Sequence, residues 1–172
     1  LVEKWIWEFK QAHPEIAIRI ASKGSKAADS ANFFINAHTL AVDEKKNRET
    51  VAISRYALLP VANSKNKLVE VYGKKGIKSK DIKKLFFEVY DPAEPDAEQK
   101  TLKELKGYKP VVYTRAQQAC APVTFAHYYG FEQENIVGKQ LGGDDKHLIM
   151  AVLNDSAGVT YNVPNYIYDL ST

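Results

Sequence analysis

Arginine is scarce in this lysine-rich sequence, and two of its arginines lie where an anion-binding group would be expected. Arg55 and Arg115 each lie in, or at the end of, an apolar stretch that predicts a β-strand. A guanidinium in such a place needs a partner, because a buried unpaired charge is very costly. The partner is either a bound anion or a carboxylate of the chain itself, and both interpretations are open. Arg19 alternates with isoleucines and Arg48 lies in a charged run, so we expect these two to face solvent.

The other reactive side chains form no recognisable catalytic or metal centre. Cys120 and His127 lie seven residues apart on a predicted helix, which separates them by about 10 Å and disfavours a cysteine–histidine nucleophile pair. The histidines, which lack the spacing of metal ligands, are His13, His38, His127 and His147. We therefore predict that the protein is not an enzyme and that it carries no cofactor and no metal.

Three short segments match ion-binding loops only in part. Gly24-Ser25-Lys26 lacks the upstream glycine of a P-loop, and Gly142-Gly143 precedes two aspartates that would repel a phosphate. The acidic stretch from Asp91 to Glu98 contains two prolines and no central glycine, which argues against a calcium loop. A solvated loop is the better interpretation of that stretch.

The elements that must position the arginines can be read from hydrophobic periodicity. Positions 1–9 predict a surface helix that ends before Pro14, and the alternation over 16–20 predicts a half-buried strand. The remaining predictions for this half are a turn with room for a phosphate at 23–30, a strand at 31–40, a loop at 43–50 and one long extended stretch at 51–62. So long an extended stretch suggests a crossover between two lobes.

The second half alternates strands and helices. Helices are predicted at 67–72 and after Ser79, which we expect to act as the cap, and a break is predicted at 73–76. The later elements are a buried strand at 108–113, a helix carrying Val123, Phe125, Ala126 and Tyr129 and ended by Gly130, a helix behind Asp144 and Asp145, and a strand at 157–162. This alternation predicts an α/β fold with mixed or parallel sheets.

Composition narrows the class of protein. The chain has 172 residues and a mass of 19.3 kDa, with 45% hydrophobic and 26% charged residues, as ordinary globular proteins do. Its net charge of +3 comes mostly from lysines spread among acids, without the dense basic stripe of a nucleic-acid binder. No apolar run approaches the roughly 20 residues of a membrane-spanning helix. A single cysteine excludes an internal disulfide framework but says little about compartment.

Several segments taken in order resemble one family, the type 2 periplasmic solute-binding proteins, and within it the phosphate-binding-like group of ABC transporters with its relatives in Bacteroidetes. The most specific are the crossover piece Ser54-Arg55-Tyr56-Ala57-Leu58-Leu59-Pro60-Val61 and the stretch 111–126 with Tyr113-Thr114-Arg115. The other segments are 1–7 with 16–20, Ile82-Lys83-Lys84-Leu85-Phe86-Phe87-Glu88, and 157–169. The resemblance covers nearly the whole chain.

The resemblance implies a two-lobed fold with mixed sheets, a first α/β lobe at 1–58 and a second at 59–172 reached by a crossover strand. In the family, the cleft between lobes holds an anion by helix N-terminal amides, an arginine and hydroxyls. Ser25 matches the Gly-Ser loop of the first lobe, and Arg115 matches the arginine before the second-lobe anion loop. The implied ligand-binding set is Arg115, Ala119, Cys120, Ala121, Ser25, Arg55 and Tyr56.

Two departures from the family pattern leave an alternative open. Ala119, Cys120 and Ala121 stand where phosphate binders have Ser-Gly-Thr, so the hydroxyl donors are missing while the amides and Thr124 remain. No carboxylate occurs near 36–38, where the family has an acid that accepts a proton from the ligand. The chain also lacks the family's closing elements, so we expect an incomplete first lobe, in either a fragment or a reduced relative.

We therefore expect an exported, periplasmic or cell-surface solute-binding protein for phosphate or a similar oxyanion. The expected partners are a small inorganic or organic anion and an ABC transporter permease, with no nucleic acid, and the expected state is a monomer. The alternative is a binding-protein-like interaction module that has lost small-molecule binding.

Overall fold

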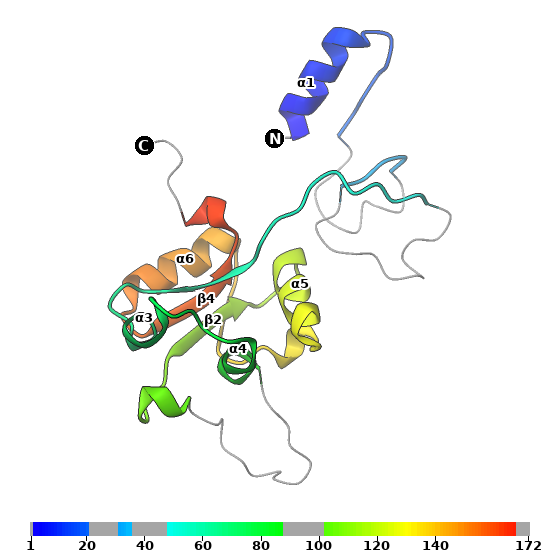
Figure 1. Ribbon diagram of the computed structural model, residues 1–172. Coiled ribbons are helices and arrows are strands. Elements are labelled where there is room, and N and C mark those ends of the chain that lie inside the picture. Colours follow the sequence, from blue (N-terminus) through cyan, green and yellow to red (C-terminus); the bar gives the residue numbers. More distant parts are fainter. Residues whose placement is uncertain (1, 21–30, 36–47, 88–101, 168–172) are drawn as a thin grey trace. The chain divides into compact units, whose positions relative to one another are not determined.

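The computed structural model describes residues 2–20, 31–35, 48–87 and 102–167 (Figure 1). The chain divides into two compact units, Leu1–Asn36 and Ala37–Thr172. The predicted division into lobes at 1–58 and 59–172 stays a prediction.

The first unit contains the predicted amphipathic helix. It is α1, Val2–Ala12, with Glu3 in its first turn and Lys10 in its last, a charge order that suits the helix dipole. The strand predicted at 16–20 is wrong: these residues form no strand, and most of them are exposed. Alternation of apolar residues produces a strand only where a neighbouring strand supplies hydrogen bonds, and the described part of this unit holds no strand.

The second unit is built on a mixed four-stranded sheet with the order β1-β4-β2-β3. Its strands are β1 Leu59–Ala62, β2 Val111–Arg115, β3 Lys139–Leu141 and β4 Gly158–Asn162. β2 pairs in parallel with both β3 and β4, whereas β1 pairs antiparallel with β4, Leu59 lying opposite Asn162. The mixed α/β class predicted from the sequence is confirmed, and the two-lobed architecture stays a prediction.

The long extended stretch predicted at 51–62 is a strand only over its last four residues. Residues 51–58 form no regular structure, and Val51 and Ile53 are strongly exposed. The residues are strand formers, but within the described part of the chain only 59–62 lie beside a strand, namely β4.

The helices of this unit are α3 Lys67–Tyr72, α4 Ser79–Phe86, α5 Cys120–Tyr129 and α6 Asp145–Asn154, with 3₁₀ turns η2 Lys103–Leu105, η3 Gln133–Asn135 and η4 Pro164–Tyr166. Gly130 ends α5 in the left-handed region at φ 82°, as predicted. Ser79 is not a cap: it is the first helical residue of α4, and Lys78 holds the N-cap position without a side-chain bond. The described residues contain no helix long and apolar enough to cross a membrane.

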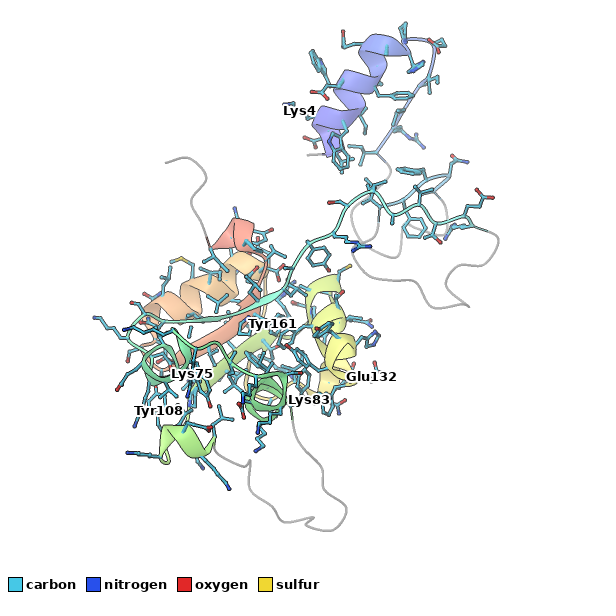
Figure 2. The ribbon with its side chains drawn as sticks, in the orientation of Figure 1. Lys4, Lys75, Lys83, Tyr108, Glu132 and Tyr161 are labelled. Atoms are coloured by element: carbon cyan, nitrogen blue, oxygen red, sulfur yellow. The ribbon has the colours of Figure 1, made fainter. Side chains whose placement is uncertain are left out.

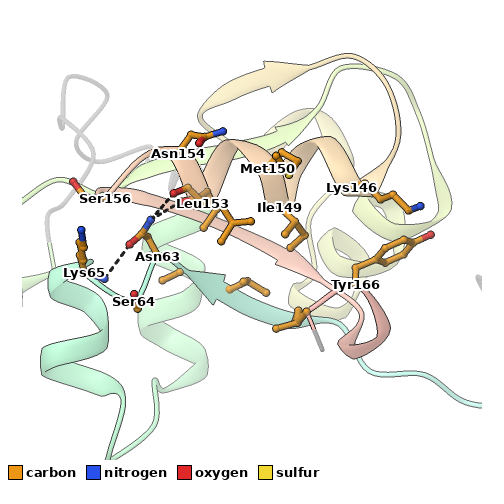
Figure 3. A pocket seen from close by; sticks show the side chains of 14 residues that line it. Asn63, Ser64, Lys65, Lys146, Ile149, Met150, Leu153, Asn154, Ser156 and Tyr166 are labelled. Carbon is orange, nitrogen blue, oxygen red and sulfur yellow. Dashed lines mark hydrogen bonds between the residues drawn. The ribbon is translucent and has the colours of Figure 1, made fainter. Parts of the chain in front are cut away.

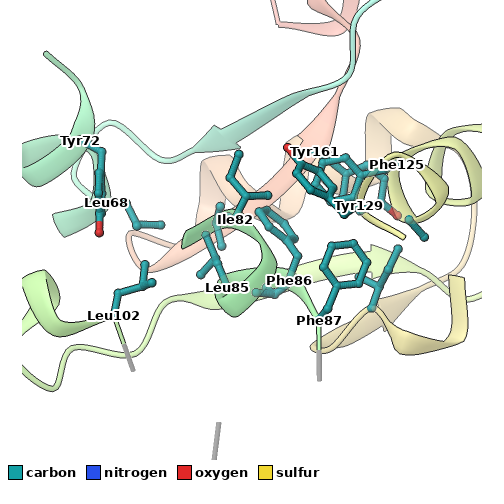
Figure 4. Packing of buried hydrophobic residues seen from close by; sticks show 14 of the residues in the cluster. Leu68, Tyr72, Ile82, Leu85, Phe86, Phe87, Leu102, Phe125, Tyr129 and Tyr161 are labelled. Atoms are coloured by element: carbon teal, nitrogen blue, oxygen red, sulfur yellow. The ribbon is translucent and has the colours of Figure 1, made fainter. Parts of the chain in front are cut away.

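The two faces of the sheet are covered differently. Side chains of β2 alternate, so Val112 faces α4 and α5 whereas Val111 and Tyr113 face α6. The first face carries the main core, which is rich in aromatic rings (Figure 4). There the Phe125 ring stacks on the Tyr161 ring at 4.4 Å, and the Phe86 ring meets Phe125 edge-on at 5.0 Å. Figure 2 places Tyr161 in this crowded centre, and the α6 face carries only a small cluster around Leu148 and Val152.

Candidate functional site

The parallel strands β2, β3 and β4 end at one edge of the sheet, and Arg115 is the last residue of the middle strand β2. The register places Arg115 opposite Leu141, the last residue of β3. After β2 the chain runs to α5 on one face of the sheet, and after β3 it runs to α6 on the other face. Adjacent strands whose connections leave in opposite directions open a crevice at their carboxyl ends, where α/β proteins commonly bind ligands. Arg115 lies at this switch point.

Arg115 is paired with a carboxylate of the same unit. Its Nη1 donates to Oδ1 of Asp145 at 2.9 Å, and the two side chains are 14% and 23% exposed. Among the described residues, Asp145 is the hydrogen-bond partner that the guanidinium has. The Nε–H of Arg115 is buried and has no hydrogen-bond partner there. A buried N–H without an acceptor is costly, so the guanidinium keeps donor capacity that Asp145 does not use.

A buried polar cluster supports this pair. Asn162, 2% exposed, donates from Nδ2 to the carbonyl of Asp145 at 3.0 Å. The hydroxyls of Thr114 and Tyr161 lie 2.7 Å apart, and burial raises the pKa of Tyr161 to about 12. Asn162 thus ties the end of β4 to the start of α6, and Tyr161 links the end of β2 to the aromatic core.

The start of α5 holds the three predicted amide donors, and the first of them donates to a side chain of η3. Ala119 is the N-cap of α5 without a side-chain cap, and its N–H donates to Oε1 of Gln133 at 3.3 Å. Cys120 and Ala121 are the first two helical residues, whose N–H groups have no acceptor inside a helix. Pro122 follows and brings no N–H, so the run of backbone donors at this helix start ends at Ala121.

The residues predicted from the crossover segment are only partly brought to this edge. Tyr56, 45% exposed, donates from its hydroxyl to Oγ1 of Thr124 in α5 at 3.3 Å. Arg55 is exposed in a segment without regular structure, so the premise that it lies within an apolar strand is wrong. Ser25 lies outside the described residues.

No metal centre emerges from the described residues. They contain no group of three or more histidine, cysteine, aspartate or glutamate side chains that could hold a metal ion. His127 on α5 pairs through Nε2 with Oε2 of Glu132 at 2.9 Å. Its partner is therefore a carboxylate of the loop after α5.

A second surface feature is an open groove of about 1010 Å³ between α6, the end of β1 and η4 (Figure 3). Apolar side chains such as Met150 and Leu153 line it, and the lining includes Lys65 and Lys146 but no carboxylate. The predicted site residues that the structure describes all lie outside this lining, so the groove is separate from the Arg115 edge.

Sequence reasoning missed the side chains that shape the site. It allowed for a carboxylate beside Arg115 but did not identify Asp145, and it overlooked Gln133, Asn162 and Tyr161. Of these residues, only Asn162 could have been predicted from the sequence. It is a polar residue at the end of a predicted strand, and ligand sites of α/β proteins lie at the carboxyl ends of strands.

The chain matches no protein-family model, and comparisons with curated proteins and with solved structures give no match.

Proposed function

We propose that the unit Ala37–Thr172 belongs to an extracytoplasmic, non-enzymatic solute-binding protein and takes a phosphate-like oxyanion at the carboxyl edge of its sheet. The observation that carries this proposal is Arg115, which ends the middle strand at the switch point and keeps donors beyond its bond to Asp145. The resemblance of the crossover and Tyr-Thr-Arg segments to the phosphate-binding-like group supports the same ligand class.

Binding would combine a charge with oriented amides. The remaining N–H groups of Arg115 donate to the oxyanion, and the N-terminus of α5 contributes its positive dipole end and the Ala121 amide. Asp145 orients the guanidinium through Nη1 and limits the negative charge that the site accepts. The arrangement therefore favours a small, singly or doubly charged anion over a highly charged one.

A ligand panel tests the proposal. The protein is heated with phosphate, sulfate, molybdate and several organic anions, and the same panel is run on Arg115→Ala and Arg115→Lys. A ligand at about 100 times its Kd stabilises the folded state by roughly 2.7 kcal/mol, which is several degrees in Tm for a unit of this size. We expect one anion to raise the Tm of the wild type and of neither variant.

Arg55→Ala is the matched control, because it removes an arginine that is exposed. It should keep the full response. Equal responses in wild type and Arg115→Lys would remove Arg115 from the site, and a panel without any shift would refute oxyanion binding by this unit.

A second candidate function is an interaction module without a small-molecule ligand. It is favoured by the 2.9 Å pair between Arg115 and Asp145 and by the Gln133 oxygen at the Ala119 amide, since both satisfy the site from within the protein. For this function the anion panel should be silent, and the variant Arg115→Met with Asp145→Leu should fold as stably as the wild type.

A further inference from the structure

Gln133 bridges the loop between β2 and α5 through both ends of its carboxamide. Oε1 accepts the Ala119 N–H at 3.3 Å, and Nε2 donates to the carbonyl of Gln117 at 3.0 Å. The same Nε2 lies 3.5 Å from the carbonyl of Arg115. The backbone thus offers a donor at one end and acceptors at the other, which only an amide side chain satisfies.

The element that carries Gln133 is itself held in place. Gln133 opens η3, whose capping box joins Glu132 and Asn135, the Glu132 N–H donating to Oδ1 of Asn135 at 2.9 Å. Glu132 also pairs with His127 of α5. The carboxamide is therefore presented from a supported position rather than from a free side chain.

The loop that Gln133 bridges leads from the guanidinium of Arg115 to the start of α5. The Ala116 N–H adds a further attachment by donating to the carbonyl of Leu141 at 2.9 Å. We propose that Gln133 is a positioning residue of the oxyanion site, an inference that rests on the function proposed above. It fixes the backbone between Arg115 and Ala119, and so sets the angle between the arginine and the amide end of α5.

The test begins with the ligand-free protein, so that it does not depend on binding. In Gln133→Ala the Ala119 amide loses its acceptor, and its hydrogen exchange, read by NMR, should become at least about tenfold faster than in the wild type. In Gln133→Glu a carboxylate oxygen faces the carbonyls of Gln117 and Arg115, which raises the pKa of the new carboxyl group. A raised folded pKa stabilises the protein at low pH and loses that effect as pH rises through it. The variant should therefore lose Tm relative to the wild type between about pH 4 and pH 7.

Gln118→Glu is the matched control for charge, since Gln118 is an exposed residue of the same loop. It should show no such pH-dependent loss. Unchanged Ala119 exchange in Gln133→Ala, or the same pH profile for both glutamate variants, would overturn the bridging role.

The second measurement is the affinity for phosphate and for sulfate by calorimetry. We expect Gln133→Ala to weaken the anion that binds by about tenfold, the size of one hydrogen-bonding group, while Gln118→Ala binds as the wild type does. Wild-type affinity in Gln133→Ala, together with a faster Ala119 amide, would refute positioning of the site. Absence of binding in the wild type would refute the proposed function and the role of Gln133 in it, while the ligand-free measurements still decide the bridge.

Discussion

The helices α5 and α6 begin at the same edge of the sheet, on opposite faces, and their N-termini are completed in opposite ways. At α6, Asp144 accepts the Lys146 N–H at 3.0 Å and shares a capping box with His147, and Asp145 follows in the first turn. At α5, Ala119 caps without a side chain, and the first turn holds no acid. The positive end of α6 is therefore neutralised by its own aspartates, whereas the cap residue of α5 receives the neutral carboxamide of Gln133.

The two helices also differ in how they are packed on the sheet, and here α5 has the more extensive contacts. α5 is fixed by stacked aromatic rings at the centre of the main core, and α6 by a small cluster around Leu148 and Val152 with an open groove beside its exposed side chains. The helix without an acid in its first turn is thus the firmly packed one. The start of α5 is firmly packed and carries no acid, so it can attract an anion. The start of α6 carries Asp145, which serves as the counter-ion of Arg115.

The largest expected effect tests this difference in packing. Phe125, 2% exposed, stacks on Tyr161, so Phe125→Ala should lower the free energy of unfolding by about 3–5 kcal/mol. Leu148→Ala on the α6 face should cost less, about 2–3 kcal/mol. Urea unfolding of both variants measures the difference, and equal losses would contradict the asymmetry.

Removal of the α6 charge tests the role of Asp145. Asp145→Asn should lose about 1–3 kcal/mol of stability, because the mostly buried guanidinium of Arg115 loses its charged hydrogen-bond partner. It should also bind phosphate or sulfate about threefold to tenfold more tightly, because the negative charge beside Arg115 is gone. Calorimetry gives the affinities, with Lys146→Gln on the same helix as control. Weaker binding would mean that Asp145 serves the ligand directly.

Moving the aspartate cap from α6 to α5 should reverse the difference between the two helix starts. Asp144→Ala removes the α6 cap and should lower the Tm by about 3 °C, whereas Ala119→Asp gives α5 a cap of its own and should raise the Tm by a similar amount. The new aspartate should also abolish oxyanion binding. Retained binding in Ala119→Asp would show that the anion does not use the start of α5.

The smallest effect concerns the other end of α6. The Tyr113 hydroxyl donates to Oδ2 of Asp155 at 2.8 Å, and this bond is the main cause that holds the pKa of Asp155 below its ordinary value. A lowered folded pKa stabilises the protein above the unfolded pKa and loses that effect as pH falls through the folded one. Tyr113→Phe should raise the pKa of Asp155 and make the acid loss of stability shallower. NMR titration of the Asp155 carboxyl decides, and an unchanged pKa would contradict the assignment.

Hydrophobic periodicity was a good guide where a segment could bury one side on the sheet. The helices over 67–72, 120–129 and 145–154 and the strand behind Ala157 follow directly from their patterns. The same reasoning was wrong for 16–20 and 51–58, because their residues favour extended backbone but the described neighbourhood gives them no strand to pair with.

The site was less predictable than the fold. The placement of Arg115 at the end of an apolar strand required a partner, and the structure supplies one in Asp145, thirty residues later. Which carboxylate is used depends on the crossover through β3, and Gln133 meets Ala119 only because η3 packs against α5. Contacts of this kind arise from the path of the chain, which local pattern does not encode.

The antiparallel edge strand has a consequence for the order of folding. β2, α5, β3, α6 and β4 follow one another in a single stretch of chain, whereas β1 pairs with a strand about a hundred positions later. Closing so large a loop costs entropy before the pairing contributes any stability. We expect the parallel part of the sheet, with Arg115 and its edge, to assemble first and β1 to join last. An edge strand that joins last is also the first to detach, so partial unfolding would free β1 while leaving the arginine edge intact.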